Sequence, residues 1–381
     1  MATPYSSELA VGLRTVHAAS QLTKAVLRSL SNSVSAETKA DDSPVTIADF
    51  AAQAVIISAL HAVYPDDKFI GEESAAALRE NGHLADRVWD LVQRAAAASA
   101  SQHSDAQHVR PLTDCDNASL LKFPATMDEM LHVIDLGTST STAQGRVWVL
   151  DPVDGTATFM EGKQYAVALS LLVDGVEQVG VIGCPNLAFD PHGPLGQSRI
   201  HEDQVDAVGY GVVLSAVKGQ GTFVRSMQAS GLGDPRRIDL QREIAPKDLS
   251  ALNFVESTIG KTSLSQAEHR QVAELLGAEW PGTVIWSQQM KYVALTLGAT
   301  DVMVRLPKTK ERFTYTWDHA GGHILFVEAG GVIKDFDGGD IFFGQGRRIE
   351  GDRNYGMVAA LPWAFDRVRQ AVGEVLERRA R

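Results

Sequence analysis

The chain has 381 residues, of which 44% are hydrophobic and 22% charged, and its formal net charge is −12. This composition is typical of a globular protein with room for two packed lobes, and an acidic chain without a basic stripe argues against broad nucleic-acid binding. No run of eighteen apolar residues occurs and no signal-peptide pattern opens the sequence, so we expect no membrane association. Only Cys115 and Cys184 are present, which favours a reducing, cytoplasmic compartment, and we expect a monomer.

Helices are predicted where apolar residues recur at helical spacing. The first runs from Glu8 to Leu30 and the second from about Ile47 to Val63, with a polar loop between them. Residues 95–108 are rich in Ala, Ser, Gln and His, which predicts a helix end that continues into a surface loop. Residues 138–145 are of low complexity and are expected to be mobile.

Strands and further helices follow. Val147 to Leu150 reads as a strand, and the apolar runs on either side of Asp174-Gly175 predict a hairpin. A second hairpin is expected around residues 218–220, a helix over residues 320–329 that ends at two glycines, and a terminal helix over residues 366–379. We expect a boundary near residue 186, with residues 1–186 in an N-terminal lobe and residues 187–381 in a C-terminal lobe.

The most informative motif is Asp151-Pro152-Val153-Asp154-Gly155-Thr156, at the end of a predicted strand. Two carboxylates three residues apart can converge on a metal ion, and the Val153 carbonyl between them is a further hard oxygen ligand. The backbone N–H groups of Gly155 and Thr156 are placed to bind phosphate. Taken alone, the motif can equally be a turn capped by an aspartate.

Three other segments add acids. Asp49 lies in the first turn of the second helix, Glu72 follows the strand-like residues 68–70, and Asp318 opens a later helix. Each of these acids alone can be explained without a metal, because acids favour helix N-termini and exposed turns. His319 is expected to be a surface or packing histidine rather than a ligand.

Together these segments resemble the inositol-monophosphatase-like superfamily. The matching motifs are Pro-Val-Thr before Asp49, Gly-Glu-Glu-Ser, Asp-Pro-Val-Asp-Gly-Thr and Trp-Asp-x-Ala-Gly, in the order of the family. The resemblance implies an α/β fold arranged as a layered αβαβα sandwich, and a phosphatase that uses two or three Mg²⁺ ions and is sensitive to Li⁺. It implies these metal ligands: Glu72, Asp151, Val153 through its carbonyl, Asp154 and Asp318. It further implies that Asp49, paired with Thr156, orients or deprotonates the attacking water.

Further stretches resemble the yeast-type bisphosphate nucleotidase branch of this superfamily, among them residues 159–167, 179–187 and 343–347. That branch removes the 3′-phosphate from 3′-phosphoadenosine 5′-phosphate and can act on the sulfated parent nucleotide. Lys291 and Arg305 are then expected to balance the nucleotide phosphates, with Lys261 as a possible substitute. The segment 257–262 departs from the branch: where the branch normally has a His-Ser-Ser element that helps to form the nucleotide pocket, this chain reads Ser-Thr-Ile-Gly-Lys-Thr. An inositol phosphate or another small phosphoester stays open as the substrate, and so does a non-catalytic role in binding a ligand or partner.

Overall fold

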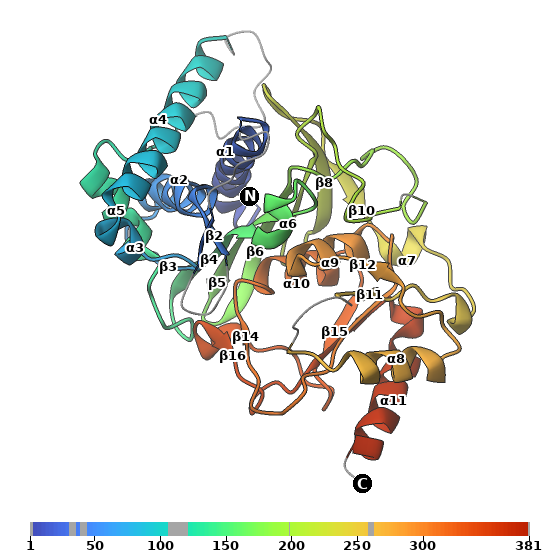
Figure 1. Cartoon of the computed structure of the whole chain (residues 1–381). Coiled ribbons are helices and arrows are strands. Elements are labelled where there is room, and N and C mark those ends of the chain that lie inside the picture. The colour runs from blue at the N-terminus through green and yellow to red at the C-terminus, as the bar shows by residue number, and fades with distance from the viewer. Residues whose placement is uncertain are drawn as a thin grey trace.

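The computed structural model describes residues 3–29, 36–38, 44–105, 121–197, 199–257 and 263–379, and within these residues the largest sheet has eight strands (Figure 1). Neighbouring strands are antiparallel except for the parallel pair β3–β4. The strands are, in spatial order, β10 (Arg236–Ile238), β8 (Gly221–Gln228), β7 (Val212–Val217), β6 (Val176–Cys184), β5 (Ala166–Val173), β4 (Arg146–Asp154) and β3 (Lys68–Gly71), with β9 (Gly231–Leu232) paired to β8.

Both predicted hairpins are present. Asp174 and Gly175 join β5 to β6 with φ of 51° and 78°, the left-handed values that a tight two-residue turn requires. A side chain at Gly175 is excluded as well, because its Cβ would lie 2.8 Å from Gly344 Cα. Residues 218–220 join β7 to β8 in the second hairpin.

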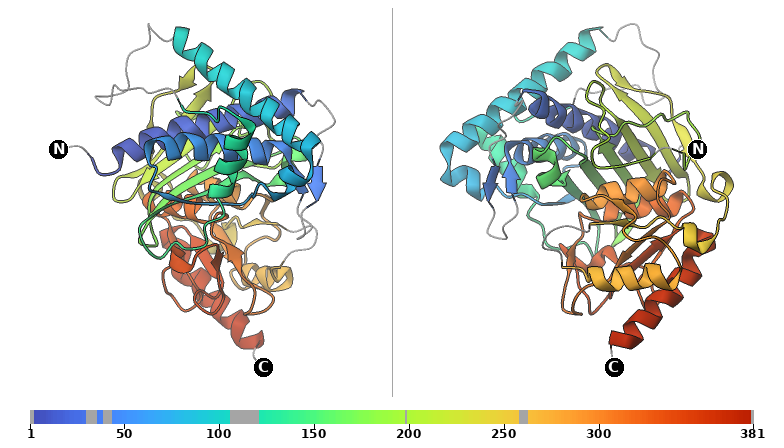
Figure 2. Two further views of the ribbon diagram at one scale, coloured as in Figure 1. Left: turned by 90° about the vertical axis from the view of Figure 1, so that its left-hand side faces the viewer. Right: turned by 45° about the vertical axis from the view of Figure 1, so that its right-hand side comes forward.

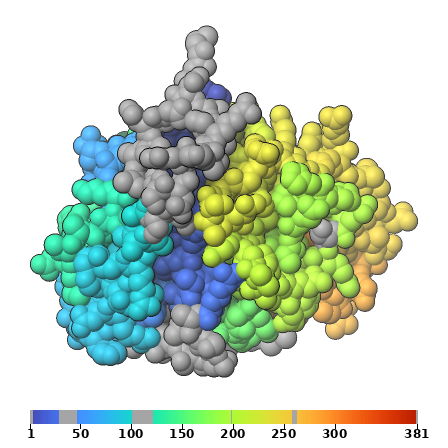
Figure 3. All heavy atoms as spheres, turned by 90° about the horizontal axis from the view of Figure 1, so that it is seen from above, coloured from blue at the N-terminus to red at the C-terminus, as the bar shows by residue number. Residues whose placement is uncertain are grey.

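One face of the sheet is covered by helices from the N-terminal part of the chain (Figures 1 and 2). They are α1 (Ser6–Ser29), α2 (Ile47–Val63), α3 (Ala76–Glu80), α4 (Gly82–Asp105) and α5 (Met127–Leu136). Helix α2 packs against the sheet on one side and against α1, α4 and α5 on the others, so its residues 47–60 are buried all round. Seen from above, the N-terminal residues in blue lie between the cyan residues of α4 and the yellow-green strands (Figure 3).

The opposite face is covered by α9 (Gln288–Thr296) and α10 (Ala320–Glu328). A second sheet follows, in the order β13 (Val302–Arg305), β17 (Met357–Ala360) and β15 (Val332–Lys334), and then α8 (Gln266–Leu275) and α11 (Pro362–Arg379). This succession of layers confirms the predicted αβαβα sandwich (Figure 2). None of the described helices is long and apolar enough to cross a membrane.

The remaining elements are short. They are β1 (Ala36–Thr38), β2 (Pro44–Thr46), α6 (Thr156–Met160), α7 (Leu240–Glu243), β11 (Val255–Glu256), β12 (Thr283–Val284), β14 (Thr314–Tyr315), β16 (Arg348–Ile349) and the 3₁₀ turns Leu249–Ala251 and Phe343–Gln345. The antiparallel pair β1–β2 falls partly in the stretch for which we expected only a polar loop.

Three details bear on the expected organisation. The expected boundary near residue 186 falls between β6 and β7, which are hydrogen-bonded neighbours in the main sheet, and the division into two lobes stays a prediction. Thr142 is buried, donates to the Phe343 carbonyl oxygen at 2.6 Å and accepts from Gly346 N–H, and the mobility of residues 138–145 stays a prediction. Helix α4 continues to Asp105, and the rest of the expected 95–108 loop lies outside the described residues.

Candidate metal centre

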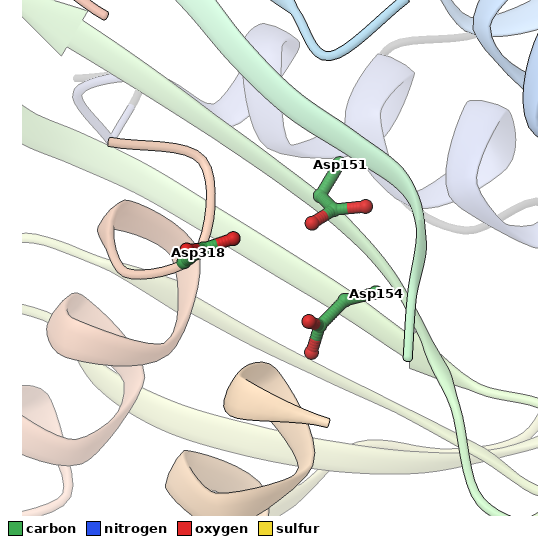
Figure 4. A group of neighbouring side chains, drawn as sticks. All are labelled: Asp151, Asp154 and Asp318. Atoms are coloured by element: carbon green, nitrogen blue, oxygen red, sulfur yellow. The ribbon is translucent and has the colours of Figure 1, made fainter. Parts of the chain in front are cut away.

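Three aspartates meet between the main sheet and the two helices α9 and α10. Asp151 and Asp154 come from the end of β4, and Asp318 comes from the turn before α10. One carboxylate oxygen of each lies within 4.8 Å of the others, and the three side chains point toward one another (Figure 4). The first two are buried and Asp318 is partly exposed.

An irregularity in β4 brings the first two aspartates together. Residues three apart in a regular strand point to opposite faces. Asp151 pairs with Ala168 and Asp154 with Ala166, so three steps along β4 match two along β5. This bulge turns both carboxylates toward the same side of the sheet.

Asp154 also binds the beginning of α9. Its carboxylate accepts hydrogen bonds from the Ser287 hydroxyl, from Gln289 N–H at 2.5 Å and from Gln288 N–H at 3.3 Å. Burial raises the pKa of Asp154, and these hydrogen bonds oppose that effect because they favour the ionised form. The contact therefore fixes the Asp154 carboxylate across the junction between the main sheet and α9.

The acids of this site are held together at an electrostatic cost. Burial, followed by the negative charges of Glu72, Asp154, Asp318 and Asp49, raises the pKa of Asp151 well above its ordinary value. Burial and the charges of Asp154 and Glu72 raise the pKa of Asp318 to about 7. Among the residues that the structure describes, no donor reaches the buried Asp151 Oδ1. Acids in such a position fit a bound cation, and a set of carboxylate oxygens fits a hard divalent ion.

Glu72 and Asp49 lie outside the group of three aspartates and come from the end of β3 in the main sheet and from the first turn of α2. Glu72 follows β3 and lines a cavity of about 430 Å³ together with Trp317 and Arg347. Asp49 is buried in the first turn of α2. The charges of both carboxylates contribute to raising the pKa of Asp151. Their roles as ligand and as base stay predictions.

The turn after β4 is tightly constrained. Gly155 has φ of 93°, and a Cβ there would lie 2.9 Å from both Ser287 Cβ and Thr158 Oγ1, so only glycine fits. The Thr156 hydroxyl donates to the Val153 carbonyl oxygen at 3.1 Å. The expected pairing of Thr156 with Asp49, and phosphate binding by the N–H groups of this turn, stay predictions.

Two cations, the buried Lys291 and the partly buried Arg305, lie near the aspartates. Lys291 belongs to α9, and burial, followed by the nearby Arg305 charge, lowers its pKa to about 8. Arg305 ends β13, donates to Gln288 Oε1 and, at 3.2 Å, to Thr314 Oγ1. The charges of Asp154 and Asp318 act on both cations and favour their protonated forms. Lys261, the suggested substitute, lies outside the described residues.

Comparison with known proteins identifies the family. The model of the inositol monophosphatase family matches residues 8–91 and 117–366. The chain belongs to the inositol monophosphatase family. It is 38% identical to a 3′(2′),5′-bisphosphate nucleotidase of Emericella nidulans over 340 residues, covering 89% of this chain and 90% of the relative. It is 35% identical to a protein of the same name from Schizosaccharomyces pombe, covering 97% and 96%.

The family's fold is also found among solved structures. The extragenic suppressor protein suhB of Bartonella henselae aligns with a TM-score of 0.58 at 17% identity, covering 96% of this chain and 98% of that one. The chain is thus a phosphatase, a phosphoric monoester hydrolase of a metal-dependent family, and its acidic cluster lies where a metal could bind.

Several residues that organise this phosphatase site were not predicted. Ser287 and Gln289 both bind Asp154, and Gln289 also donates to the Trp317 carbonyl oxygen at 2.6 Å and accepts from Gly322 N–H. Gln289 thereby joins the Asp154 side of the site to the turn that carries Asp318. The one available signal was Ser287 before a helix, since serine is a preferred N-cap. His319 is buried and bonded to Tyr292 and Thr314, which confirms a packing role.

Proposed function

We propose that this phosphatase depends on Mg²⁺ and removes the 3′-phosphate of 3′-phosphoadenosine 5′-phosphate, giving AMP and phosphate. The proposal extends to 3′-phosphoadenylyl sulfate as a second substrate. The observation that carries it is the convergence of Asp151, Asp154 and Asp318 within 4.8 Å, near the buried Lys291 and the partly buried Arg305. The printed names of the relatives support the choice of a nucleotide that carries two phosphates.

The carboxylates would hold two or three Mg²⁺ ions. The proposed ligands are the carboxylates of Glu72, Asp151, Asp154 and Asp318 and the carbonyl of Val153. The orphaned Asp151 Oδ1 supports this assignment, because a buried carboxylate oxygen without a donor is costly unless a cation is bound. When bound, the ions neutralise the phosphate and activate the attacking water.

Asp49 and Thr156 would act on the water. Asp49 is buried in the first turn of α2. In our proposal its carboxylate takes the proton of the attacking water while the Thr156 hydroxyl orients that water. The new phosphorus–oxygen bond forms as the bond from phosphorus to the 3′ oxygen breaks, and the released 3′ oxygen takes up a proton.

Lys291 and Arg305 would bind the second phosphate of the substrate. Lys291 is buried and Arg305 is partly buried, so both charges are incompletely solvated in the protein without substrate, and burial lowers the pKa of each. A phosphate placed between them adds a negative charge close to both cations and forms charge-assisted hydrogen bonds. Each such bond contributes roughly 1.5–3 kcal/mol, so a substrate without the second phosphate should lose about ten- to a hundredfold in kcat/KM.

A substrate panel tests this proposal. Phosphate release is measured from 3′-phosphoadenosine 5′-phosphate, its sulfated parent, 2′,5′-ADP, AMP and inositol 1-phosphate with Mg²⁺ present. Arg305→Ala should reduce kcat/KM for the bisphosphates and leave inositol 1-phosphate almost unchanged. Arg270→Ala is the matched control, because Arg270 is exposed and pairs only with Glu274 of its own helix among the described residues.

The substrate assignment fails if inositol 1-phosphate is cleaved as fast as the bisphosphate, or if Arg305→Ala slows both substrates equally. In either case a metal-dependent phosphatase would remain. The proposal further includes a monomer in the cytoplasm, which size-exclusion chromatography and cell fractionation test. Cys184 is buried and unpaired among the described residues, which supports a reducing compartment.

A further inference from the structure

Arg347 connects two parts of the metal centre that lie far apart in the sequence. It stands between the 3₁₀ turn Phe343–Gln345 and β16. Its guanidinium donates from Nη2 to the Gly71 carbonyl oxygen at 2.9 Å and from Nη1 to the Gly137 carbonyl oxygen at 3.0 Å. Gly71 directly precedes Glu72, so Arg347 holds the backbone from which that carboxylate projects.

The same side chain also touches the segment that carries Asp318. The guanidinium carbon lies 4.7 Å from the ring centroid of Trp317, which directly precedes Asp318. Tyr315 stacks on Trp317 with centroids 4.4 Å apart and planes 9° from parallel. A planar guanidinium can stack and donate two hydrogen bonds at the same time, whereas a lysine ammonium cannot.

The backbone around Arg347 is itself fixed. Thr316 donates from its N–H to the Arg347 carbonyl oxygen at 2.9 Å and from its hydroxyl to the Gly346 carbonyl oxygen at 2.6 Å. On the other side of Glu72, buried Gln53 accepts from Glu73 N–H at 3.0 Å and donates to the Glu73 carbonyl oxygen at 2.8 Å. Gln53 thus ties the Glu72 turn to the N-terminal helices, and Arg347 ties it to the Asp318 segment.

Arg347 is not a member of a surface ion pair in the part of the chain that the structure describes. Among the described residues no carboxylate forms an ion pair with its guanidinium, and burial lowers its pKa while the Glu72 charge opposes that effect. Two of its donors are used on backbone carbonyls instead. Arg347 thus uses a partly buried charge to hold backbone carbonyl groups, one of them directly before Glu72. This arrangement is explained if the position of the Glu72 carboxylate matters.

We propose that Arg347 is a positioning residue that fixes Glu72 relative to Asp318, so that both carboxylates can reach the same metal centre. The inference rests on the proposed function, because it takes both acids as ligands. Mg²⁺-class ions require near-ideal geometry, so a small displacement of one carboxylate weakens binding. Residues that orient metal ligands typically contribute about ten- to a hundredfold to metal affinity.

Direct metal binding tests the inference without substrate. The full-length protein is titrated with Mn²⁺, and free Mn²⁺ is measured by electron paramagnetic resonance. Arg347→Ala should raise the Kd by about ten- to a hundredfold. Arg348→Ala is the matched control: Arg348 is the next residue, is exposed and stacks on Phe313. It should change the Kd by less than about twofold, on the scale of a surface substitution.

A double-mutant cycle shows whether Arg347 acts through Glu72. Glu72→Gln should weaken Mn²⁺ binding, and adding Arg347→Ala to it should weaken binding no further than about twofold, since coupled residues are not additive. If Arg347 only supported the fold, the two substitutions would act independently, and their fold-changes in Kd for Mn²⁺ would multiply. Circular dichroism checks that each variant is folded. If Arg347→Ala does not fold, Arg347→Lys replaces it, with an expected loss of at least about threefold because the planar fork is gone.

Three results would overturn the inference: wild-type affinity in the Arg347 variant, an equal loss in Arg348→Ala, or multiplying effects in the cycle. These are distinct from a failure of the proposed function. If the unmodified protein binds no Mn²⁺, the metal-dependent mechanism falls and the inference falls with it. If the unmodified protein binds Mn²⁺ and Arg347→Ala binds it equally well, only the role of Arg347 is refuted.

Discussion

Replacing Asp318 by Asn should stabilise the metal-free protein while it impairs metal binding. Burial, together with the charges of Asp154 and Glu72, raises the pKa of Asp318 to about 7, against an ordinary value of 3.8. As pH rises, the unfolded chain therefore releases this proton before the folded protein does. The metal-free folded state loses stability from about pH 4 to about pH 7, and the loss is complete above pH 7.

The size of this effect follows from the two pKa values. The gap between 3.8 and about 7 corresponds to at most about 4 kcal/mol of unfolding free energy. Asp318 is partly exposed, and solvent screening reduces the effect to about 1–3 kcal/mol. Asparagine carries no charge, so Asp318→Asn should recover this free energy. For a chain of this length the gain corresponds to a rise in Tm of about 1–4 °C.

Thermal unfolding in chelator at pH 5 and pH 8 measures the effect. Asp318→Asn should melt above the unmodified protein at pH 8, with a smaller difference at pH 5. Added Mg²⁺ should then raise the Tm of the unmodified protein and leave that of the variant nearly unchanged, because a ligand stabilises only the state that binds it. A variant that melts at the same temperature as the unmodified protein at pH 8, or below it, would refute the reasoning.

Three further predictions concern catalysis. Asp49→Asn and Thr156→Ala should each lower kcat by at least about a hundredfold with a smaller change in KM; near-normal kcat in both would rule out the proposed water-activating pair. Gly155→Ala should lower both Tm and kcat, because φ is 93° and the new Cβ would lie 2.9 Å from Ser287 Cβ; a variant unchanged in both would contradict this. The pKa of Lys291 is lowered to about 8, so the charge that binds the second phosphate is lost as pH rises through 8. KM for the bisphosphate should rise above that pH, Lys291→Arg should remove the rise, and a flat profile in the unmodified protein would count against the assignment.

Much of the fold was predictable because local patterns agree with the final packing. Helix α2 was predicted with its observed bounds, Ile47–Val63. Asp174-Gly175 specified its hairpin because few other residues adopt the left-handed conformation of both turn positions. The two glycines after α10 do end that helix, since Gly331 N–H bonds back to the Phe326 carbonyl oxygen. The contacts of residues 138–145 could not be predicted locally, because the hydrogen bonds that hold Thr142 come from residues about two hundred positions away.

The candidate site, like the fold, could be predicted from the sequence only in part. Asp151, Asp154 and Asp318 were named from motifs, and the structure brings these three together. The bulge that turns two of them to one side leaves no periodic signal in the sequence. Arg347 was seen only as part of a matching stretch, because its contacts with Gly71 and Trp317 depend on how distant layers of the sandwich pack.

Phosphate release from 3′-phosphoadenosine 5′-phosphate, with Mg²⁺ and with chelator, is the most direct test of the central claim. Release should occur with Mg²⁺, stop when the metal is chelated, and return when Mg²⁺ is restored in excess. Asp154→Asn should abolish it at every Mg²⁺ concentration tested, because the variant lacks a charge that metal binding needs. Full activity in chelator, or normal activity of Asp154→Asn, would contradict a mechanism that depends on metal held by these carboxylates.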